Sequence, residues 1–293
     1  MKYILKMLLV IMSFSAFAKD VDINKKNKND LDSILLEVGE WRDIGPFRGG
    51  RSTTATGITS SDQIYYMGTT GGGLWKTYDA GLSWKNVSDG FFATGSVGAV
   101  SVSESNNNIV VVGMGESPVR GVMTSSGDGV YKSVDAGETW KHIGLDGTKH
   151  ISQVRIHPHN PDVMYVSAQG SPYVDTQDRG VYRTTDGGKN WKKVLFVDAS
   201  SGAIDLAMDY TNPRILYAAF WDHQRLPWYV RSGGKGSGIW KSVDGGDTWK
   251  KLEDGLPKSL MGKIGVTVSR ANPKLLYAII ESDEGGLYKS QDG

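Results

Sequence analysis

The sequence contains no cysteine, which excludes disulfide bonds, thiolate metal sites and a cysteine nucleophile. It also has no excess of charge of either sign, because 33 Lys and Arg residues stand against 32 Asp and Glu residues. A chain with this balance gives no electrostatic reason to expect nucleic acid or an anionic membrane surface as a partner. Hydrophobic residues make up 39% of the 293 positions, which is enough to build a packed core without disulfide support.

Long hydrophobic runs are missing as well. Lys2 and Lys6 precede an apolar run at residues 7–14, and the tripeptide Ala-Phe-Ala follows at 16–18. A membrane-spanning helix needs about 20 apolar residues, so this run is too short. A basic start, a short apolar stretch and a small-residue cleavage pattern are typical of a secretory signal peptide, which we predict at residues 1–18. The mature protein is then expected to be exported, to the periplasm, the outer surface or the medium, without a membrane span; an unprocessed N-terminal anchor is the alternative.

The most informative feature that is present is an eight-residue pattern, which occurs four times and begins a fifth time. Each full copy has a Ser or Thr, an Asp two positions later, a Gly after two more, and a Trp at the end, as in residues 77–84. The aspartates of the five copies are Asp79, Asp135, Asp186, Asp244 and Asp292. Successive aspartates lie 48 to 58 residues apart, which is the signature of a repeat protein. Because the fifth copy breaks off at Gly293, we expect the chain to be a fragment.

Each repeat contains four short segments with the character of β-strands. An alternating segment such as 203–206 leads to an Asn-Pro turn, for example at 212–213, and a second apolar segment follows. A third segment, such as 238–241, leads into the eight-residue pattern, and a fourth follows its Trp. Four strands per repeat of about 50 residues are typical of propeller blades. The sequence therefore predicts an all-β fold: a polar leader at 19–40, then a β-propeller of four-stranded blades over 41–293, incomplete after part of blade five.

The repeated aspartates are interpreted as residues that hold turns. A short Asp side chain accepts hydrogen bonds from the backbone N–H groups of its own turn. The Gly two positions later is expected at a positive φ, and the Trp ring is expected between strands. We therefore nominate none of these aspartates as catalytic residues or metal ligands, and we expect no metal and no cofactor. His157 and His159 could chelate a metal. They fall in an Asn-Pro turn, however, which is expected on the same face of the propeller as the aspartate turns.

The pattern resembles the Asp-box, or BNR, repeats of sialidases, sortilin-type propellers and xyloglucanase-like glycosidases. The chain also resembles large secreted bacterial proteins described as sortilin-like or BNR glycosyl hydrolases. The segments that carry this resemblance are residues 41–51 (Trp-Arg-Asp-Ile-Gly-Pro-Phe-Arg-Gly-Gly-Arg), 71–76 and 202–206. The resemblance extends over residues 41–293. It implies the propeller fold, and it implies either the binding of peptides and glycans or the hydrolysis of polysaccharides, because one fold hosts many functions.

Topology predicts where a ligand should bind. Antiparallel strands alternate in direction, so the Asn-Pro turns and the Asp-box turns leave one face, and the remaining loops leave the other face around the central channel. The loops on this second face are long and differ between blades, as binding loops do. Aromatic rings beside carboxylates and arginines suit glycans and peptides equally, so we expect an extracellular polymer of either kind. The candidate binding residues are Arg48, Arg51, Glu116, Arg120, Tyr173, Asp178, Arg179, Trp221, His223, Arg225 and Trp228. The alternative is that these loops pack on each other and bury their own side chains.

An enzymatic role is left open. Phe47-Arg48 resembles only the start of the motif that opens sialidase domains. An inverting glycosidase of the xyloglucanase type needs two carboxylates, one as acid and one as base. The resemblance would place one of them at position 69, where this sequence has Thr69, and a threonine cannot replace a carboxylate in acid–base chemistry. Glu116, Asp128 and Asp222 are the alternative candidates. The leading prediction is a binding propeller of the sortilin type; a glycoside hydrolase or a purely structural scaffold are the alternatives.

Overall fold

The computed structural model describes residues 51–119 and 124–293. The predicted signal peptide at 1–18, the leader at 19–40, and the candidate residues Arg48 and Arg120 lie outside the described residues. Within the described ranges, no helix is long and apolar enough to cross a membrane.

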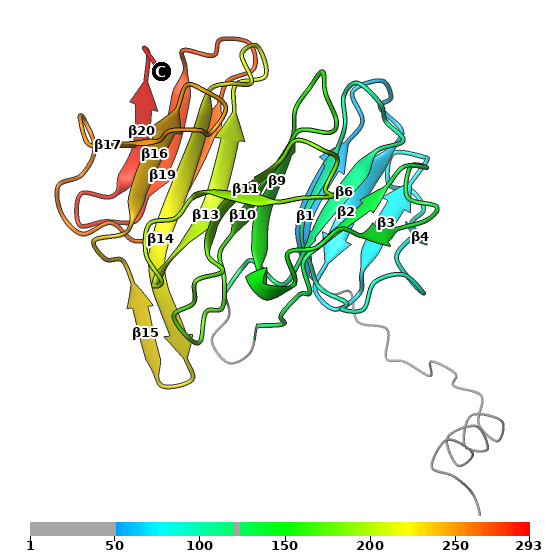
Figure 1. Cartoon of the computed structure of the whole chain (residues 1–293), viewed down its shortest axis with the longest axis horizontal. Helices are drawn as coiled ribbons and strands as arrows, with labels where there is room; N and C mark the ends of the chain where they lie inside the picture. Colours follow the sequence, from blue (N-terminus) through cyan, green and yellow to red (C-terminus); the bar gives the residue numbers. More distant parts are fainter. Residues whose placement is uncertain (1–50, 120–123) are drawn as a thin grey trace, which may run out of the picture. The chain divides into compact units, whose positions relative to one another are not determined.

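The described chain forms five antiparallel sheets that follow one another in sequence order (Figure 1). The first is β1 (Ser52–Gly57), β2 (Tyr65–Thr69), β3 (Leu74–Thr77) and β4 (Lys85–Asn86), and the second is β5 (Val97–Val102), β6 (Val110–Met114), β7 (Val130–Ser133) and β8 (Lys141–His142). The third is β9 (Ile151–Ile156), β10 (Met164–Ala168), β11 (Gly180–Thr184) and β12 (Lys192–Leu195). The fourth is β13 (Ser201–Met208), β14 (Leu216–Leu226), β16 (Gly238–Ser242) and β17 (Lys250–Leu252), with β15 (Tyr229–Ser232) paired to β14. The fifth is β18 (Ile264–Val268), β19 (Leu276–Ile280) and β20 (Gly286–Ser290). The prediction of an all-β propeller with four-stranded blades is confirmed.

The second strands of the second and third blades lie wholly in the core. All five residues of β6 and all five of β10 are buried, because neighbouring blades cover both faces of these sheets. The first strands of the blades adjoin one another in order, β1 beside β5, β5 beside β9, β9 beside β13 and β13 beside β18. We call these five the inner strands.

Four of the inner strands contain a β-bulge near the same end. The pairing register skips one residue in each of β1, β5, β9 and β13, and the skipped residues are Thr53, Gly98, Ser152 and Ile204. Two of these side chains join adjacent blades. The Thr53 hydroxyl donates to the Val97 carbonyl, and the Ser152 hydroxyl donates to the Ala203 carbonyl at 2.8 Å. At Gly98 a Cβ atom would lie 2.1 Å from the Ile151 carbonyl oxygen, so the blades approach too closely there for any side chain.

One end of the sheets carries short turns that repeat from blade to blade. We call it the turn end; it holds the turns between first and second strands (58–64, 103–109, 157–163, 209–215 and 269–275) and the aspartate turns between third and fourth strands (77–84, 133–140, 184–191 and 242–249). The two kinds of turn are joined by backbone hydrogen bonds in four blades. These run from Ala80 to Gln63 (2.9 Å), Ala136 to Asn108 (2.8 Å), Gly187 to Asp162 (3.0 Å) and Gly245 to Arg214 (2.8 Å). The predicted position of both kinds of turn at one end is thus observed.

The second aspartate turn shows how each is built. Asp135 accepts hydrogen bonds from the Thr139 backbone N–H (2.9 Å), the Thr139 hydroxyl (2.5 Å) and the Ser133 hydroxyl (2.7 Å). Hydrogen bonds from Thr139 first, and then from Ser133, lower the pKa of Asp135 to about 2. Gly137, two positions after the aspartate, has a φ of 93°, which is the positive value that the sequence predicted. The indole N–H of Trp140 donates to the Val87 carbonyl of the preceding blade at 2.7 Å. The turn therefore closes its own blade and also ties it to its neighbour.

The structure corrects one sequence-based expectation. The candidate residues Trp221 to Trp228 were expected in a long loop, but β14 continues to Leu226 and turns back through Pro227 and Trp228 into β15. A proline at the second position of a tight turn, followed by aromatic and β-branched residues, favours this hairpin.

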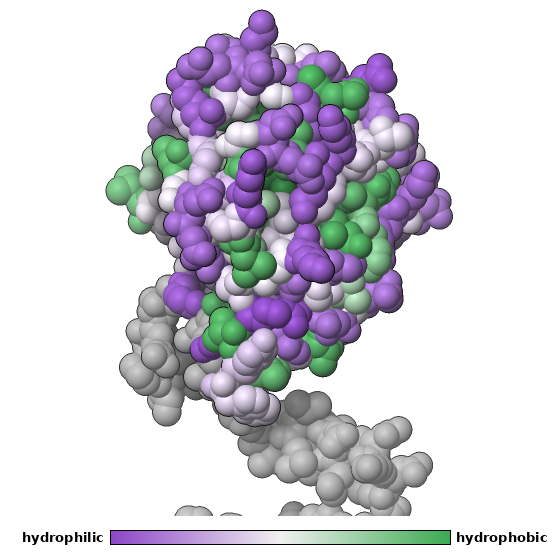
Figure 2. All heavy atoms as spheres, turned by 90° about the vertical axis from the view of Figure 1, so that its left-hand side faces the viewer, coloured by the Kyte–Doolittle hydropathy of each residue, from purple (hydrophilic) through white to green (hydrophobic). Residues whose placement is uncertain are grey.

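The outer face of the fifth blade differs from the others. Leu287, at the start of its third strand, is 72% exposed, whereas the residues at that place in the preceding blades are almost fully buried: Leu74, Val130, Val181 and Ile239. Figure 2 shows this side of the molecule, where hydrophobic side chains form separate patches between hydrophilic ones. Each of the first four blades is covered on this face by the blade that follows it.

Candidate ligand-binding face

The opposite end of the sheets, which we call the loop end, carries the segments that differ between blades. Between the second and third strands lie residues 70–73 in the first blade, 115–129 in the second, 169–179 in the third and the β14–β15 hairpin with residues 233–237 in the fourth. At this end the inner strands enclose a cavity of about 570 Å³. Its polar lining includes Ser117, Ser152, Asp205, Lys263 and Glu281. This volume falls within the range of about 300–1,000 Å³ that is usual for ligand pockets.

Glu116 lies beside this cavity but inside the protein, with 1% of its surface exposed. Its carboxylate forms an ion pair with Arg51 of the first blade, whose side chain is 44% exposed. The same carboxylate accepts a hydrogen bond from the Ser125 backbone N–H at 3.2 Å. The structure therefore brings together two predicted site residues that are 65 positions apart, and it uses both to join the first two blades.

A second buried polar group links the third and fourth blades. Arg179 is fully buried and donates to the carbonyls of Ser171 (2.7 Å) and Ser200. His223, 1% exposed, lies 3.2 Å from the Gln169 side-chain nitrogen and 3.4 Å from the Arg179 guanidinium. Burial first, and then the charge of Arg179, lower the pKa of His223 to about 3. Arg179 and His223 were predicted as ligand contacts, but their side chains hold the loops from within.

A third group surrounds Asp222 at the base of the hairpin. Arg231 donates from Nε to Asp222 at 2.8 Å and from Nη2 to Asp175 at 3.3 Å. Trp221, 8% exposed, stacks on His223 with 4.3 Å between ring centroids, and the Lys263 ammonium lies 5.6 Å from the Trp221 ring centroid. The ion pairs and the stack give the hairpin a rigid base.

The hairpin tip is exposed and aromatic. Trp228 is 81% exposed, Tyr229 is 46% exposed and Val230 is 53% exposed. Strand β14 of the hairpin is bonded to the neighbouring loop. The Arg225 backbone N–H donates to the Pro172 carbonyl at 2.7 Å, and the Gln224 amide donates to the Tyr173 carbonyl at 3.0 Å. Of the tryptophans that the structure describes, Trp228 is the one classed as exposed, so the fold does not use its ring for packing.

Other predicted residues are hydrogen-bonded within the protein. The Tyr173 hydroxyl lies 2.7 Å from the Thr124 backbone N–H, from which it accepts. Asp178 accepts from the Thr176 hydroxyl at 2.9 Å. Asp128 accepts from the Thr94 hydroxyl at 2.9 Å and the Tyr131 hydroxyl at 2.6 Å. Each of the three candidate catalytic carboxylates, Glu116, Asp128 and Asp222, is thus engaged by donors of the protein itself.

Two further observations bear on chemistry. The Thr69 hydroxyl donates to the Gly73 carbonyl at 2.9 Å, so it closes a turn of the first blade. Among the described residues, no three His, Asp or Glu side chains are grouped as metal ligands. Sequence reasoning missed Asp205, Lys263 and Glu281: Asp205 lies within β13, and Lys263 and Glu281 flank β18 and β19.

Comparison with known proteins agrees with this architecture. Residues 128–292, more than half of the chain, match the family model described as "Sortilin, neurotensin receptor 3". The chain belongs to the Sortilin-Vps10 family. This Sortilin-Vps10 protein is 24% identical over 226 residues to a xyloglucanase of Hypocrea jecorina, covering 71% of this chain and 26% of the relative. It is also 34% identical over 91 residues to vacuolar protein sorting/targeting protein 10 of Kluyveromyces lactis, covering 28% of this chain and 5% of the relative.

A solved structure supports the fold of this Sortilin-Vps10 protein. An ancestral GH74 enzyme superposes with a TM-score of 0.61 at 18% identity, covering 82% of this chain and 30% of that one. The chain therefore spans a quarter to a third of the xyloglucanase and the GH74 enzyme that it resembles.

Proposed function

We propose that this propeller binds an extracellular polymer, a glycan or a peptide, at its loop end. The observation that carries the proposal is the hairpin tip, where Trp228 is 81% exposed on a rigid base. An exposed indole offers a flat face for stacking on a sugar ring or on a peptide side chain. The arginine–carboxylate pairs beside it, Arg231 with Asp222 and Asp175, add polar groups that suit hydroxyls and amides.

Among these polymers the xyloglucanase relatives favour a glycan, so the first probe is xyloglucan oligosaccharide, with an unrelated peptide library as the second. Binding is measured by calorimetry or by retention on an immobilised ligand. Trp228→Ala is expected to weaken binding at least tenfold, which corresponds to about 1.4 kcal/mol. Tyr78→Ala is the matched control, because Tyr78 is an aromatic residue 50% exposed at the turn end. Equal binding by wild type and Trp228→Ala, or no binding to either probe, would contradict the proposal.

Glycoside hydrolysis is the second candidate, favoured by the similarity to the xyloglucanase. The structure argues for binding over hydrolysis, because Glu116, Asp128 and Asp222 all accept hydrogen bonds or form ion pairs within the protein. Incubation with xyloglucan should therefore release no new reducing ends. Turnover that disappears in Glu116→Gln, Asp128→Asn or Asp222→Asn would identify a catalytic carboxylate and replace the binding proposal.

Export is part of the same proposal and rests on the N-terminal pattern of residues 1–18. The mature protein should begin at Lys19, which N-terminal sequencing of material recovered outside the cytoplasm would show. A chain that still begins at Met1 in that material would support the N-terminal anchor instead.

A further inference from the structure

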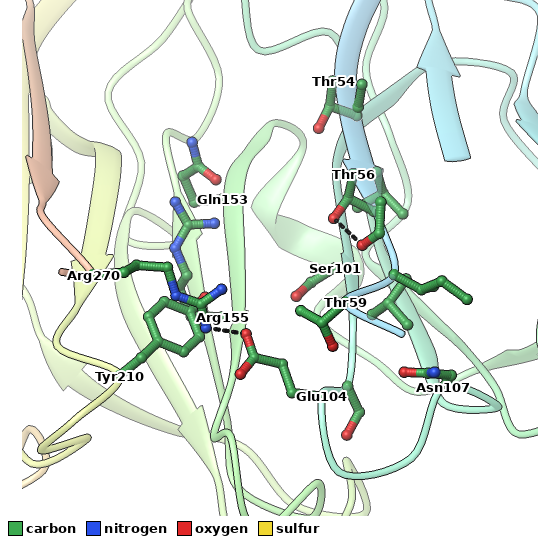
Figure 3. A pocket seen from close by; sticks show the side chains of 16 residues that line it. Thr54, Thr56, Thr59, Ser101, Glu104, Asn107, Gln153, Arg155, Tyr210 and Arg270 are labelled. Atoms are coloured by element: carbon green, nitrogen blue, oxygen red, sulfur yellow. Dashed lines mark hydrogen bonds and ion pairs between the residues drawn. The ribbon is translucent and has the colours of Figure 1, made fainter. Parts of the chain in front are cut away.

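A second cavity lies at the turn end of the inner strands, away from the proposed polymer site (Figure 3). Its volume is about 330 Å³, and it is lined by parts of β1, β5 and β9 together with Tyr210 and Arg270. Thr54 and Gln153 line both this cavity and the one at the loop end, so the two are neighbouring parts of the space between the inner strands.

One wall of the cavity is cationic because of the alternation along β9. Val154 and Ile156 are buried in the core at 1% and 3% exposure, so Gln153 and Arg155 occupy the opposite face of the strand, toward the cavity. Arg155 donates one hydrogen bond, from Nη1 to the Val154 carbonyl at 3.1 Å. No carboxylate of the described residues forms an ion pair with Arg155, which leaves the rest of its planar donor set directed at the cavity.

The second arginine of this wall is occupied. Arg270 forms an ion pair with Glu104, and its guanidinium carbon lies 4.0 Å from the centroid of the Tyr210 ring. The lining contains two arginines and one glutamate, so its net charge is +1. Because the charges of Arg270 and Glu104 neutralise each other, the remaining positive charge is that of Arg155. A lining with one uncompensated positive charge suits a monoanion better than a dianion such as phosphate.

The facing wall consists of hydroxyl groups and one amide. Figure 3 shows Thr54, Thr56, Thr59 and Ser101 opposite Arg155 across the cavity. Asn107 donates from its amide nitrogen to the Ser60 hydroxyl at 2.5 Å, whereas its buried carbonyl oxygen has no hydrogen-bond partner. A buried acceptor without a donor is unfavourable, and a ligand hydroxyl would satisfy it.

We propose that this cavity binds one hydroxylated carboxylic acid, specifically the sugar ring of a hexuronate. The carboxylate takes the Arg155 donors in the bidentate geometry that guanidinium favours, with the Gln153 amide beside them. The ring hydroxyls meet the threonine and serine hydroxyls and the Asn107 carbonyl oxygen. The volume of about 330 Å³ lies at the lower end of ligand pockets and accommodates a single sugar ring.

Calorimetry on the full chain tests the proposal with galacturonate as the probe and galactose as the neutral control. Galacturonate is expected to bind at least tenfold more tightly than galactose. Arg155→Met should reduce galacturonate affinity at least tenfold. Arg155→Lys, which keeps the positive charge but cannot form the bidentate hydrogen bonds of a guanidinium, should reduce the affinity less. Arg214→Met is the matched control, because Arg214 is an exposed arginine at the same end and should leave the affinity unchanged. Thermal melting of each variant establishes that it is folded.

Several outcomes would contradict the proposed hexuronate site. Equal affinity for galacturonate and galactose would mean that the carboxylate is not recognised. Unchanged affinity in a folded Arg155→Met would mean that Arg155 does not bind the ligand. Tighter binding of N-acetylalanine than of galacturonate would assign the cavity to a peptide carboxylate instead of a sugar acid. Because Trp228 lies on the hairpin at the loop end, Trp228→Ala should leave galacturonate binding intact, so this proposal and the polymer proposal fail independently.

Discussion

The turn end and the loop end of the sheets are stabilised by different patterns of polar contacts. At the turn end, four aspartate turns repeat one set of hydrogen bonds with nearly the same distances, such as 2.7 Å from Thr77 to Asp79 and 2.7 Å from Ser133 to Asp135. At the loop end the polar contacts join different blades in different ways: an ion pair between the first and second, and a buried arginine and histidine between the third and fourth. The aspartate turns are thus closed by local contacts, whereas the polar groups at the loop end pair residues distant in sequence.

This difference predicts where sequence change should be tolerated. A local turn depends on a few neighbouring residues, so it can be copied into each blade unchanged. The loop end instead divides into an inner rim, where blades touch through backbone atoms, and an outer part such as the hairpin tip, which carries little packing. Variation belongs to the outer part.

The inner rim should give the largest effect. Gly98→Ala would place a Cβ atom 2.1 Å from the Ile151 carbonyl oxygen and 2.5 Å from the Gly115 carbonyl oxygen, and backbone atoms cannot yield as a side chain can. We expect a loss of about 3 kcal/mol in the free energy of unfolding, measured by denaturant titration. Gly265→Ala is the matched control, because the contact there is the Ile279 side chain at 3.2 Å. Similar losses of stability in both variants would show that backbone contacts at the inner rim tolerate an added methyl group no less than side-chain contacts do.

The aspartate turns should come next. Asp135→Ala removes an acceptor of three hydrogen bonds, from the Thr139 N–H, the Thr139 hydroxyl and the Ser133 hydroxyl. We expect a loss of about 2 kcal/mol in the same titration, because the donors lose a charged partner. Asp89→Ala changes an exposed aspartate outside these turns and should stay within about 0.5 kcal/mol of wild type. A loss at Asp135 no larger than at Asp89 would contradict the turn-holding role.

A third effect depends on pH and separates the two ends. The pKa of His223 is about 3 in the folded protein against about 6.5 in the unfolded chain, so between these values the unfolded state binds a proton that the folded state does not. Stability from this histidine is complete above pH 6.5 and declines as the pH falls, by at most about 1.4 kcal/mol per pH unit. His223→Gln should flatten the curve of unfolding free energy between pH 6.5 and 4. His159→Gln is the control, since it replaces a histidine that is exposed at the turn end. An unchanged slope in His223→Gln would refute the assignment.

The smallest effect on stability should come from the hairpin tip. Trp228→Ala removes a side chain that is 81% exposed, so the free energy of unfolding should change by less than about 0.5 kcal/mol while polymer binding is lost. Chemical denaturation beside the binding assay measures both. A large loss of stability would mean that the ring packs on the fold, and the distinction between rim and tip would disappear.

The sequence predicted the aspartate turns well because the contacts that close each of them are local. Asp135, Gly137 and Thr139 lie within five positions, and their spacing alone indicates a closed turn with a positive φ at the glycine. The resulting repeat was sufficient to predict a propeller of four-stranded blades.

The loop end could not be predicted to the same degree. The pairing of Arg51 with Glu116 depends on how two blades pack, and nothing in either local segment indicates it. Arg179 and His223 are polar residues in variable segments, so exposure was the natural expectation, yet long-range contacts bury both. The cavity beside Arg155 was missed because Gln153 and Arg155 look like the solvated face of an ordinary strand until the inner strands are brought together.

Strand β14 belongs to both the blade and the hairpin without a break, and it pairs with β13 and β16 along its first half and with β15 along its second. A polymer held at the hairpin tip and pulled along the strand would load the hydrogen bonds to both neighbours in shear, so that many must break together. Tension on a bound ligand would therefore be carried into the middle of the fourth blade, and the hairpin would act as a tether anchored in the sheet.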